Sequence, residues 1–130
     1  MKIETLSVVI DAPADTVYHF VRDAHNLPRW VPFFTSVTAT ADADTWQAQT
    51  PDGPTEIQFA PSNSFGVLDH RIRFSSGAIL SNPMRVIKNG NGCVLMFTLF
   101  QINNMSEAQF NEDVRLVEKD LKTIRQLIEV

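Results

Sequence analysis

Residues 9–32, VIDAPADTVYHFVRDAHNLPRWVP, decide how this chain folds, because the spacing of apolar residues changes within them. Just before and at their start, Leu6, Val8 and Ile10 alternate with other residues, which predicts a strand with one strongly apolar face. From Pro13 onward the apolar residues recur at helical spacing, and proline suits a first helical position. The stretch therefore predicts a strand followed directly by a helix.

A second, short helical turn is predicted over residues 26–34, NLPRWVPFF, where two prolines bound it. This turn crowds Trp30, Phe33 and Phe34 together. Such a cluster either packs in the core beneath the turn or gates a pocket.

Beyond this turn, clusters of turn-forming residues divide the chain into six further strands. These clusters are ADAD at 41–44, PDGP at 51–54, PSNS at 61–64, SSGA at 75–78 and NGNG at 89–92. With the first strand they predict seven strands in an antiparallel meander. Pro83 falls inside the strand expected over 79–88, and a proline in a strand is typical of an edge or a bulge.

Tight turns also fix which residues face each other across a hairpin. The turn at 51–54 predicts that Ala48 lies opposite Ile57 and that Trp46 lies opposite Phe59. The turn at 61–64 then predicts Ile57 opposite Leu68. One apolar face results, and it contains Trp46, Ala48, Ile57, Phe59, Leu68, His70 and Ile72.

The turn at 89–92 joins the last two predicted strands and assigns their residues to two faces. Met84 groups with Phe97, whereas Arg85 groups with Met96 on the other face. The geometry at Pro83 decides whether His70 neighbours Asn82 and Met84 or Arg85.

Residues 106–130 predict one long amphipathic helix. Ser106 and Gln109 have the spacing of a capping box. The apolar residues recur at gaps of four and three, at Phe110, Val114, Val117, Leu121, Ile124 and Ile128. At about 1.5 Å per residue the helix spans roughly 35 Å, enough to cross a whole sheet.

Composition narrows the class of protein. The chain has 130 residues, 44% of them hydrophobic, and suits a single domain over residues 1–130. A net charge of -4 without a basic patch argues against a nucleic-acid or anionic-membrane partner. One cysteine, Cys93, and three scattered histidines predict no internal disulfide and no metal site. No apolar run is long enough to span a membrane, and we expect a cytoplasmic protein.

The order strand, two short helices, six strands and long helix is that of the helix-grip fold. Residues 9–32 resemble the opening of the SRPBCC or START-like superfamily, polyketide cyclase/dehydrase-like group. The stretches FGVLDHRI at 65–72, NPMRV at 82–86 and DLKTIRQLIE at 120–129 are similar to a bacterial subgroup of it. The resemblance implies an α+β fold in which a curved, seven-stranded antiparallel sheet wraps the C-terminal helix.

The resemblance also implies a cavity between the sheet and the last helix for an apolar, aromatic or lipid-like small molecule, without a cofactor. Trp30, Phe33 and Phe34 are then expected at its mouth. The residues expected deeper in are Trp46, Phe59, His70, Asn82, Met84, Phe97 and Val117.

His70 is the one candidate catalytic residue. It is either a core histidine bonded to a backbone carbonyl, Asn82 or water, or a cavity group that orients a ligand or acts as a general base. The second role would suit a cyclase or dehydratase. Asp69 lies on the opposite strand face and is not expected to orient the imidazole, and the sequence offers no convincing second ionisable group.

A third interpretation is a protein-interaction module. If Leu95, Phe97 and Leu99 point inward, Met96 and Phe100 form an outer apolar patch on the last strand. Either a second copy of the chain covers this patch in a homodimer or the neighbouring strands do.

Overall fold

The change of period in residues 9–32 appears as a strand followed by helices in the computed structural model, which describes all residues from Met1 to Val130. In chain order the elements are β1 (Ile3–Ile10), α1 (Ala14–Arg22), the 3-10 turn η1 (Ala24–Asn26), α2 (Leu27–Trp30), β2 (Ser36–Ala39), β3 (Thr45–Thr50), β4 (Gly53–Phe59), β5 (His70–Arg73), β6 (Ile79–Asn82), β7 (Met84–Asn89), β8 (Gly92–Phe100) and α3 (Glu107–Ile128). The two short helices predicted after the first strand are confirmed.

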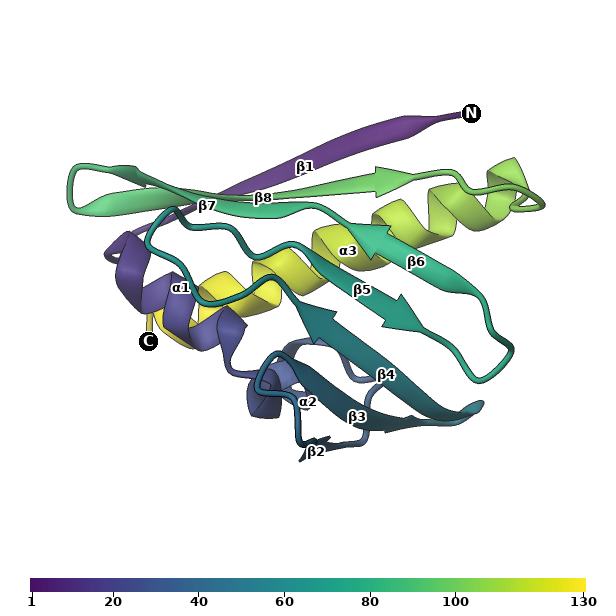
Figure 1. Ribbon diagram of the computed structural model, residues 1–130. Coiled ribbons are helices and arrows are strands. Elements are labelled where there is room, and N and C mark those ends of the chain that lie inside the picture. Colours follow the sequence, from purple (N-terminus) through teal and green to yellow (C-terminus); the bar gives the residue numbers. More distant parts are fainter.

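The strands form two antiparallel sheets. One has the order β1-β8-β7 and the other the order β2-β3-β4-β5-β6. In Figure 1 the long helix α3, in yellow and green, runs behind the strands, and it contacts β1, β8 and α2. The predicted α+β class, with antiparallel strands packed on a long C-terminal helix, is confirmed.

The predicted number of seven strands is wrong, because the strand expected over 79–88 is divided at Pro83 into β6 and β7. Proline has no N–H to donate to a ladder, so the chain leaves one sheet here and enters the other. The carboxylate of Asp69 accepts a hydrogen bond of 2.8 Å from the Met84 N–H and also pairs with the Arg85 side chain. Asp69 thus stabilises, from the outer face, the point at which the chain passes from β6 to β7.

The register predicted for two hairpins is also wrong, although the facing is right. Trp46 lies opposite Ile57 rather than Phe59, and Phe59 lies opposite His70. In both ladders the observed pairing differs from the predicted one by an even number of residues. The reason is that the loops joining these strands do not have the predicted bounds, 51–54 and 61–64. Since side chains alternate with a period of two, an even displacement leaves every residue on its predicted face.

The pairing across the turn at 89–92 is confirmed, with Met84 opposite Phe97 and Arg85 opposite Met96. The strand β8 lies between β1 and β7, and its outward residue Met96 is partly buried there. The outer patch predicted for Met96 and Phe100 is wrong in part, because Phe100 lies at the end of β8, beyond the β7 ladder, and lines the pocket described below.

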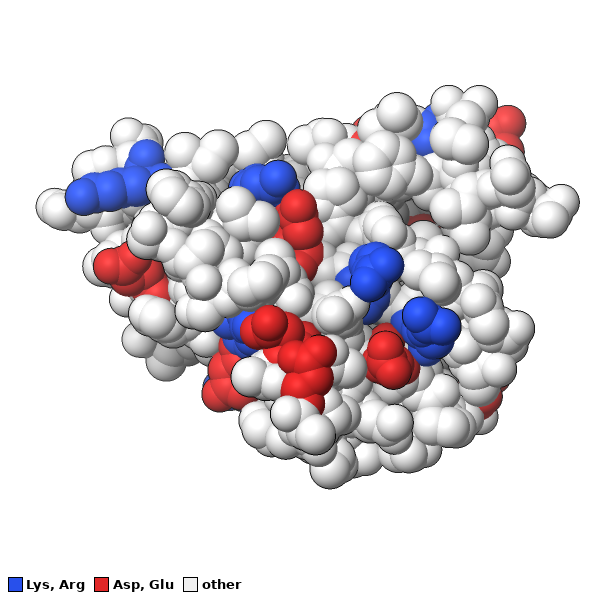
Figure 2. Space-filling model, in the orientation of Figure 1, with Lys and Arg blue, Asp and Glu red and all other residues white.

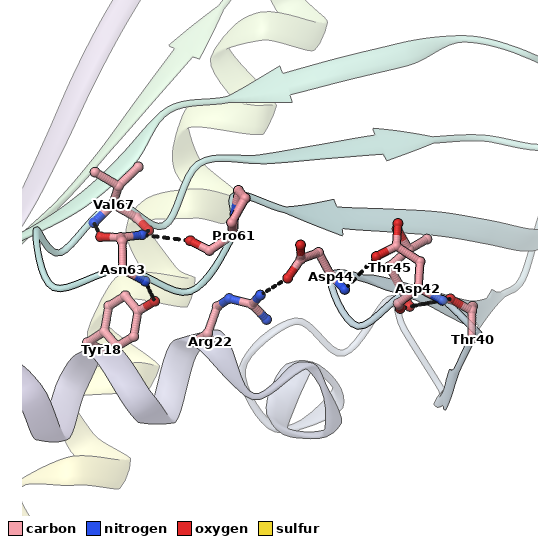
Figure 3. Close-up of polar contacts among 9 residues, drawn as sticks. All are labelled: Tyr18, Arg22, Thr40, Asp42, Asp44, Thr45, Pro61, Asn63 and Val67. Atoms are coloured by element: carbon pink, nitrogen blue, oxygen red, sulfur yellow. Dashed lines mark hydrogen bonds and ion pairs between the residues drawn. The ribbon is translucent and has the colours of Figure 1, made fainter.

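Polar contacts attach α1 to two loops (Figure 3). The hydroxyl of Tyr18 accepts a hydrogen bond of 3.0 Å from the Asn63 N–H, and Arg22 forms a 2.6 Å ion pair with Asp44. The Asn63 side chain also accepts from the N–H of Val67 at 3.1 Å. These contacts fix the loop 61–67 beside α1.

The long helix begins as predicted, because the Ser106 hydroxyl accepts a hydrogen bond of 3.0 Å from the Gln109 N–H. Its apolar side enters the core through Phe110, Leu121 and Ile124. None of the helices combines the length and the apolar character needed to cross a bilayer. On the face shown in Figure 2, basic and acidic side chains are interspersed.

Candidate functional site

An apolar pocket lies between the strands and α3. Its volume is about 480 Å³, and 20 of its 25 lining residues are hydrophobic. The strands β4, β5, β6 and β8 supply one wall, α2 and the residues after it supply a second, and α3 supplies a third. The volume falls within the range of about 300 to 1,000 Å³ typical of small-molecule sites.

Seven of the ten candidate residues line this pocket. They are Trp30, Phe33, Phe34, His70, Asn82, Phe97 and Val117. Phe33 is 38% exposed and its ring packs edge-on against buried Phe34, with the ring centroids 5.7 Å apart. A partly exposed aromatic beside a buried one is the arrangement expected at a pocket mouth.

Trp46, Phe59 and Met84 do not line the pocket and instead belong to the core beside it. The guanidinium of Arg22 lies over the rings of Trp46 and Phe59, at 5.1 and 5.4 Å from their centroids. These two rings therefore pack toward α1. The sequence placed them on the correct strand face but could not show that Arg22 covers them.

His70 has the contacts of a core histidine and also lies in the wall of the pocket. Its side chain is buried, packs between the rings of Phe59 and Phe97 and also lines the pocket. Its Nδ1 lies 3.1 Å from the Leu68 carbonyl oxygen, and its Nε2 lies 3.4 Å from Nδ2 of Asn82. It is a histidine with structural hydrogen bonds in a pocket wall.

These contacts define the state of the imidazole. Because a carbonyl oxygen can only accept, Nδ1 carries the proton and Nε2 keeps its lone pair. Burial lowers the pKa of His70, whereas the Leu68 carbonyl and the neighbouring Asp69 raise it less. The ring is therefore neutral near pH 7. The 3.4 Å contact with Asn82 is long, so Nε2 remains available to a proton donor on a ligand.

Two carboxylic acids in the pocket wall were not identified from the sequence. Asp113 and Asp120 on α3 both line the pocket. The side-chain amide of Gln109 donates a 2.8 Å hydrogen bond to Asp113, while no side chain donates to Asp120. Burial raises the pKa of Asp113, and it raises the pKa of Asp120 to about 7. The sequence spacing could have identified them, because Asp113 and Asp120 follow Phe110 and Val117 by three residues each and so lie on the same side of the helix.

One further polar atom of the pocket residues lacks a partner. Trp30 is 3% exposed and lines the pocket, and its indole Nε1 has no hydrogen-bond acceptor in the protein. A buried N–H without an acceptor costs about 1–3 kcal/mol. This atom has almost no accessible surface, so it is a strained feature of the core beside the pocket and not a group presented to a ligand.

Two other side chains that could react or bind a charged ligand, Cys93 and Arg85, lie outside this pocket. Cys93 is buried, and burial raises the pKa of its thiol, so the sulfur stays protonated near pH 7. Arg85 lies on the outer face with Asp69, as the strand facing predicted.

Comparison with known proteins gives a family match over nearly the whole chain. The family described as polyketide cyclase / dehydrase and lipid transport matches residues 3–126. No curated protein matches the chain.

Several solved structures share the fold at low sequence identity. An uncharacterised protein from Bacillus thuringiensis is 15% identical with a TM-score of 0.76, and the match covers 99% of this chain and 100% of that one. A START superfamily protein from Mycobacterium smegmatis is 12% identical with a TM-score of 0.76, covering 98% and 97% of the two chains. DynU16, from the dynemicin biosynthetic locus, is 14% identical with a TM-score of 0.78, covering 100% of this chain and 48% of that one.

Proposed function

The chain belongs to the polyketide cyclase / dehydrase and lipid transport family, and from this premise we propose that it binds an apolar or aromatic small molecule in the pocket between the strands and α3. The observation that carries the proposal is the pocket itself, with its volume of about 480 Å³ and 20 hydrophobic residues among 25. Burial of apolar ligand surface against such walls is favourable by about 25 cal/mol per Å².

The polar groups of the pocket give the ligand a defined orientation. His70 and Asn82 offer an acceptor and a donor at the strand wall. A few convergent polar groups in an apolar pocket are typical of sites that recognise one class of small molecule. A ligand with a hydroxyl group suits this pair, because a hydroxyl both donates and accepts.

A second candidate function is that of a cofactor-independent cyclase or dehydratase. It is favoured by the presence of His70, Asp113 and Asp120 in the wall of one pocket. In a dehydration, Nε2 of His70 would take a proton from a carbon next to a carbonyl, and a protonated carboxyl would donate a proton to the departing hydroxyl. The products are a carbon–carbon double bond and water, and solvent returns the protons to their starting positions.

The first experiment is native mass spectrometry of the protein purified from its host, with extraction and identification of any bound molecule. It is paired with fluorescence titration of N-phenyl-1-naphthylamine, a neutral apolar probe. We expect a stoichiometric apolar compound or saturable binding of the probe. The extracted compound is then incubated with the protein to detect turnover.

A variant that fills the pocket supplies the control. Val117 lines the pocket from α3, so Val117→Trp is expected to abolish probe binding by occupying the space. Glu118 is exposed next to it, with 57% of its side-chain surface accessible, so Glu118→Trp adds the same bulk outside. Equal binding by both variants, or an empty protein that ignores the probe, would contradict the proposal and favour a protein partner.

A further inference from the structure

The electrostatic character of the pocket is unusual for a site that holds lipids. The ionisable side chains among its lining residues are Asp113, Asp120 and His70, and no lysine or arginine is among them. The imidazole is neutral near pH 7. The wall therefore carries only potential negative charge, and a fatty acid or another carboxylate would enter without a cation to pair with.

Asp120 is a partly exposed carboxylic acid in this wall, without a partner in the protein. It lies on α3 between Val117 and Leu121, and no hydrogen bond or ion pair within the protein satisfies its carboxylate. The only nearby charge that favours its ionised form is Lys119, its neighbour in sequence. An ionised carboxylate with apolar surroundings gains more from a cation than an exposed one does, because the local dielectric constant is low.

A second feature of the pocket, its aromatic lining, also suits a cationic ligand. Seven lining residues are phenylalanine or tryptophan, among them Trp30 and Phe97, and the faces of such rings attract ammonium groups.

We propose that the pocket selects an apolar amine, and that the carboxylate of Asp120 binds its ammonium group. This inference rests on the proposed function, since it names the ligand class of the same site. Asp113 adds negative potential from two turns earlier on the same helix, while its Gln109 contact keeps it partly satisfied. Asp120 is thus assigned as the residue that determines specificity.

The test uses three probes with one ring system and different charge. They are 2-(1-naphthyl)ethylamine, 2-(1-naphthyl)ethanol and 1-naphthylacetate, measured by calorimetry with the full chain at pH 8 and low salt. We expect the amine to bind at least about tenfold more tightly than the alcohol, and the acetate to bind most weakly. Equal affinities for amine and alcohol, or a preference for the acetate, would overturn the assignment and leave the apolar pocket intact.

Two variants localise the effect. Asp120→Asn keeps the shape of the side chain and is expected to remove the preference for the amine without changing the affinity for the alcohol. Glu118→Gln removes one charge from the exposed side of the same helix, and is expected to leave all three affinities unchanged. If the amine preference survives in Asp120→Asn, Asp120 is not its binding group. If none of the probes binds the wild-type protein, the proposed function fails together with this inference.

The pH dependence gives a readout that a structural role for Asp120 would not produce. The groups that share the pocket with it are Asp113 on α3 and His70 on β5, with Lys119 beside it in sequence. An alkylamine stays protonated up to about pH 10, so only the protein titrates between pH 5.5 and 8. Binding of the amine should strengthen over this interval as the Asp120 carboxyl ionises, whereas binding of the alcohol should stay constant. A flat profile for the amine would overturn the proposal.

Discussion

Asn82 lies directly opposite His70 in the β5–β6 ladder, and its Nδ2 is 3.4 Å from the imidazole Nε2. This relationship, with the hydrogen bond to the Leu68 carbonyl, fixes the tautomer and leaves a weakly engaged lone pair at the pocket wall. Because His70 is buried, its protonation should make the stability of the protein sensitive to acid.

The titration of His70 should appear in the stability of the protein. Because its pKa is lowered in the folded state, the unfolded chain binds more protons once the pH falls below about 6.5. This contribution to stability is therefore present at neutral pH and lost as the pH falls. We expect His70→Gln to lose less stability than the wild type between pH 7 and pH 5, measured by urea unfolding. Identical losses would mean that His70 is accessible to protons in the folded state.

Asp120 should have the opposite effect. Its pKa is raised from 3.8 to about 7 in the folded state, so the folded protein binds more protons than the unfolded chain between these values. Stability from this group is greatest in acid and is lost as the pH rises through about 7. We expect Asp120→Asn to melt a few degrees higher than the wild type at pH 8, with a smaller difference at pH 5. A constant difference at both pH values would show that the partial burial of this carboxyl does not raise its pKa.

The contact between α3 and the core can be tested at Leu121. This side chain is 2% exposed, so Leu121→Ala leaves a cavity and should lower the free energy of unfolding by about 2–5 kcal/mol. Leu116 on the same helix is 42% exposed, and Leu116→Ala should cost less than about 1 kcal/mol. Similar losses in both variants, by chemical denaturation, would show that the buried side of α3 is wrongly assigned.

Gly66 marks a close approach between the loop 61–67 and β7. Its φ is +72°, and a Cβ there would lie 2.2 Å from the Val86 carbonyl oxygen. Gly66→Ala should therefore lose at least about 2 kcal/mol of stability, because both the backbone conformation and the contact oppose it.

Gly77 is the matched control for this prediction. It also has a positive φ of +91°, but a Cβ there would meet no atom within 4 Å. Gly77→Ala should cost only the conformational strain of about 1 kcal/mol. If the two glycine variants unfold at the same denaturant concentration, the close approach at Gly66 is not a constraint.

The sequence predicted the elements and their facing because both depend on local periodicity. Alternation in the strands and the three-four spacing in α3 report which side chains are buried, and a ladder displaced by two residues preserves them. Thus His70 and Phe97 were placed on the inner face, although the partner of Ile57 was assigned wrongly, since Ile57 lies opposite Ile72 and not Leu68.

What could not be predicted depends on contacts between distant segments. The exchange of strands between sheets at Pro83 is accompanied by a contact with Asp69, which lies just before β5 and which no local pattern around Pro83 encodes. Asp113 and Asp120 appeared as ordinary polar residues of a partly exposed helix, and only the packing of α3 against the strands places them in a pocket. The position of Arg22 over Trp46 could not be predicted for the same reason, because it depends on how α1 packs against the strands.

The pairing of β1 with β8 has a consequence for how the protein folds. β1 is an edge strand, and its one partner lies near the opposite end of the sequence, with Ile10 paired to Cys93. No local hairpin can form this ladder, so its formation must await closure of a very long loop, and contacts of this kind slow folding. The amide protons of β1 should therefore report assembly of the whole chain in a hydrogen-exchange experiment, whereas those of the β7–β8 hairpin can become protected early.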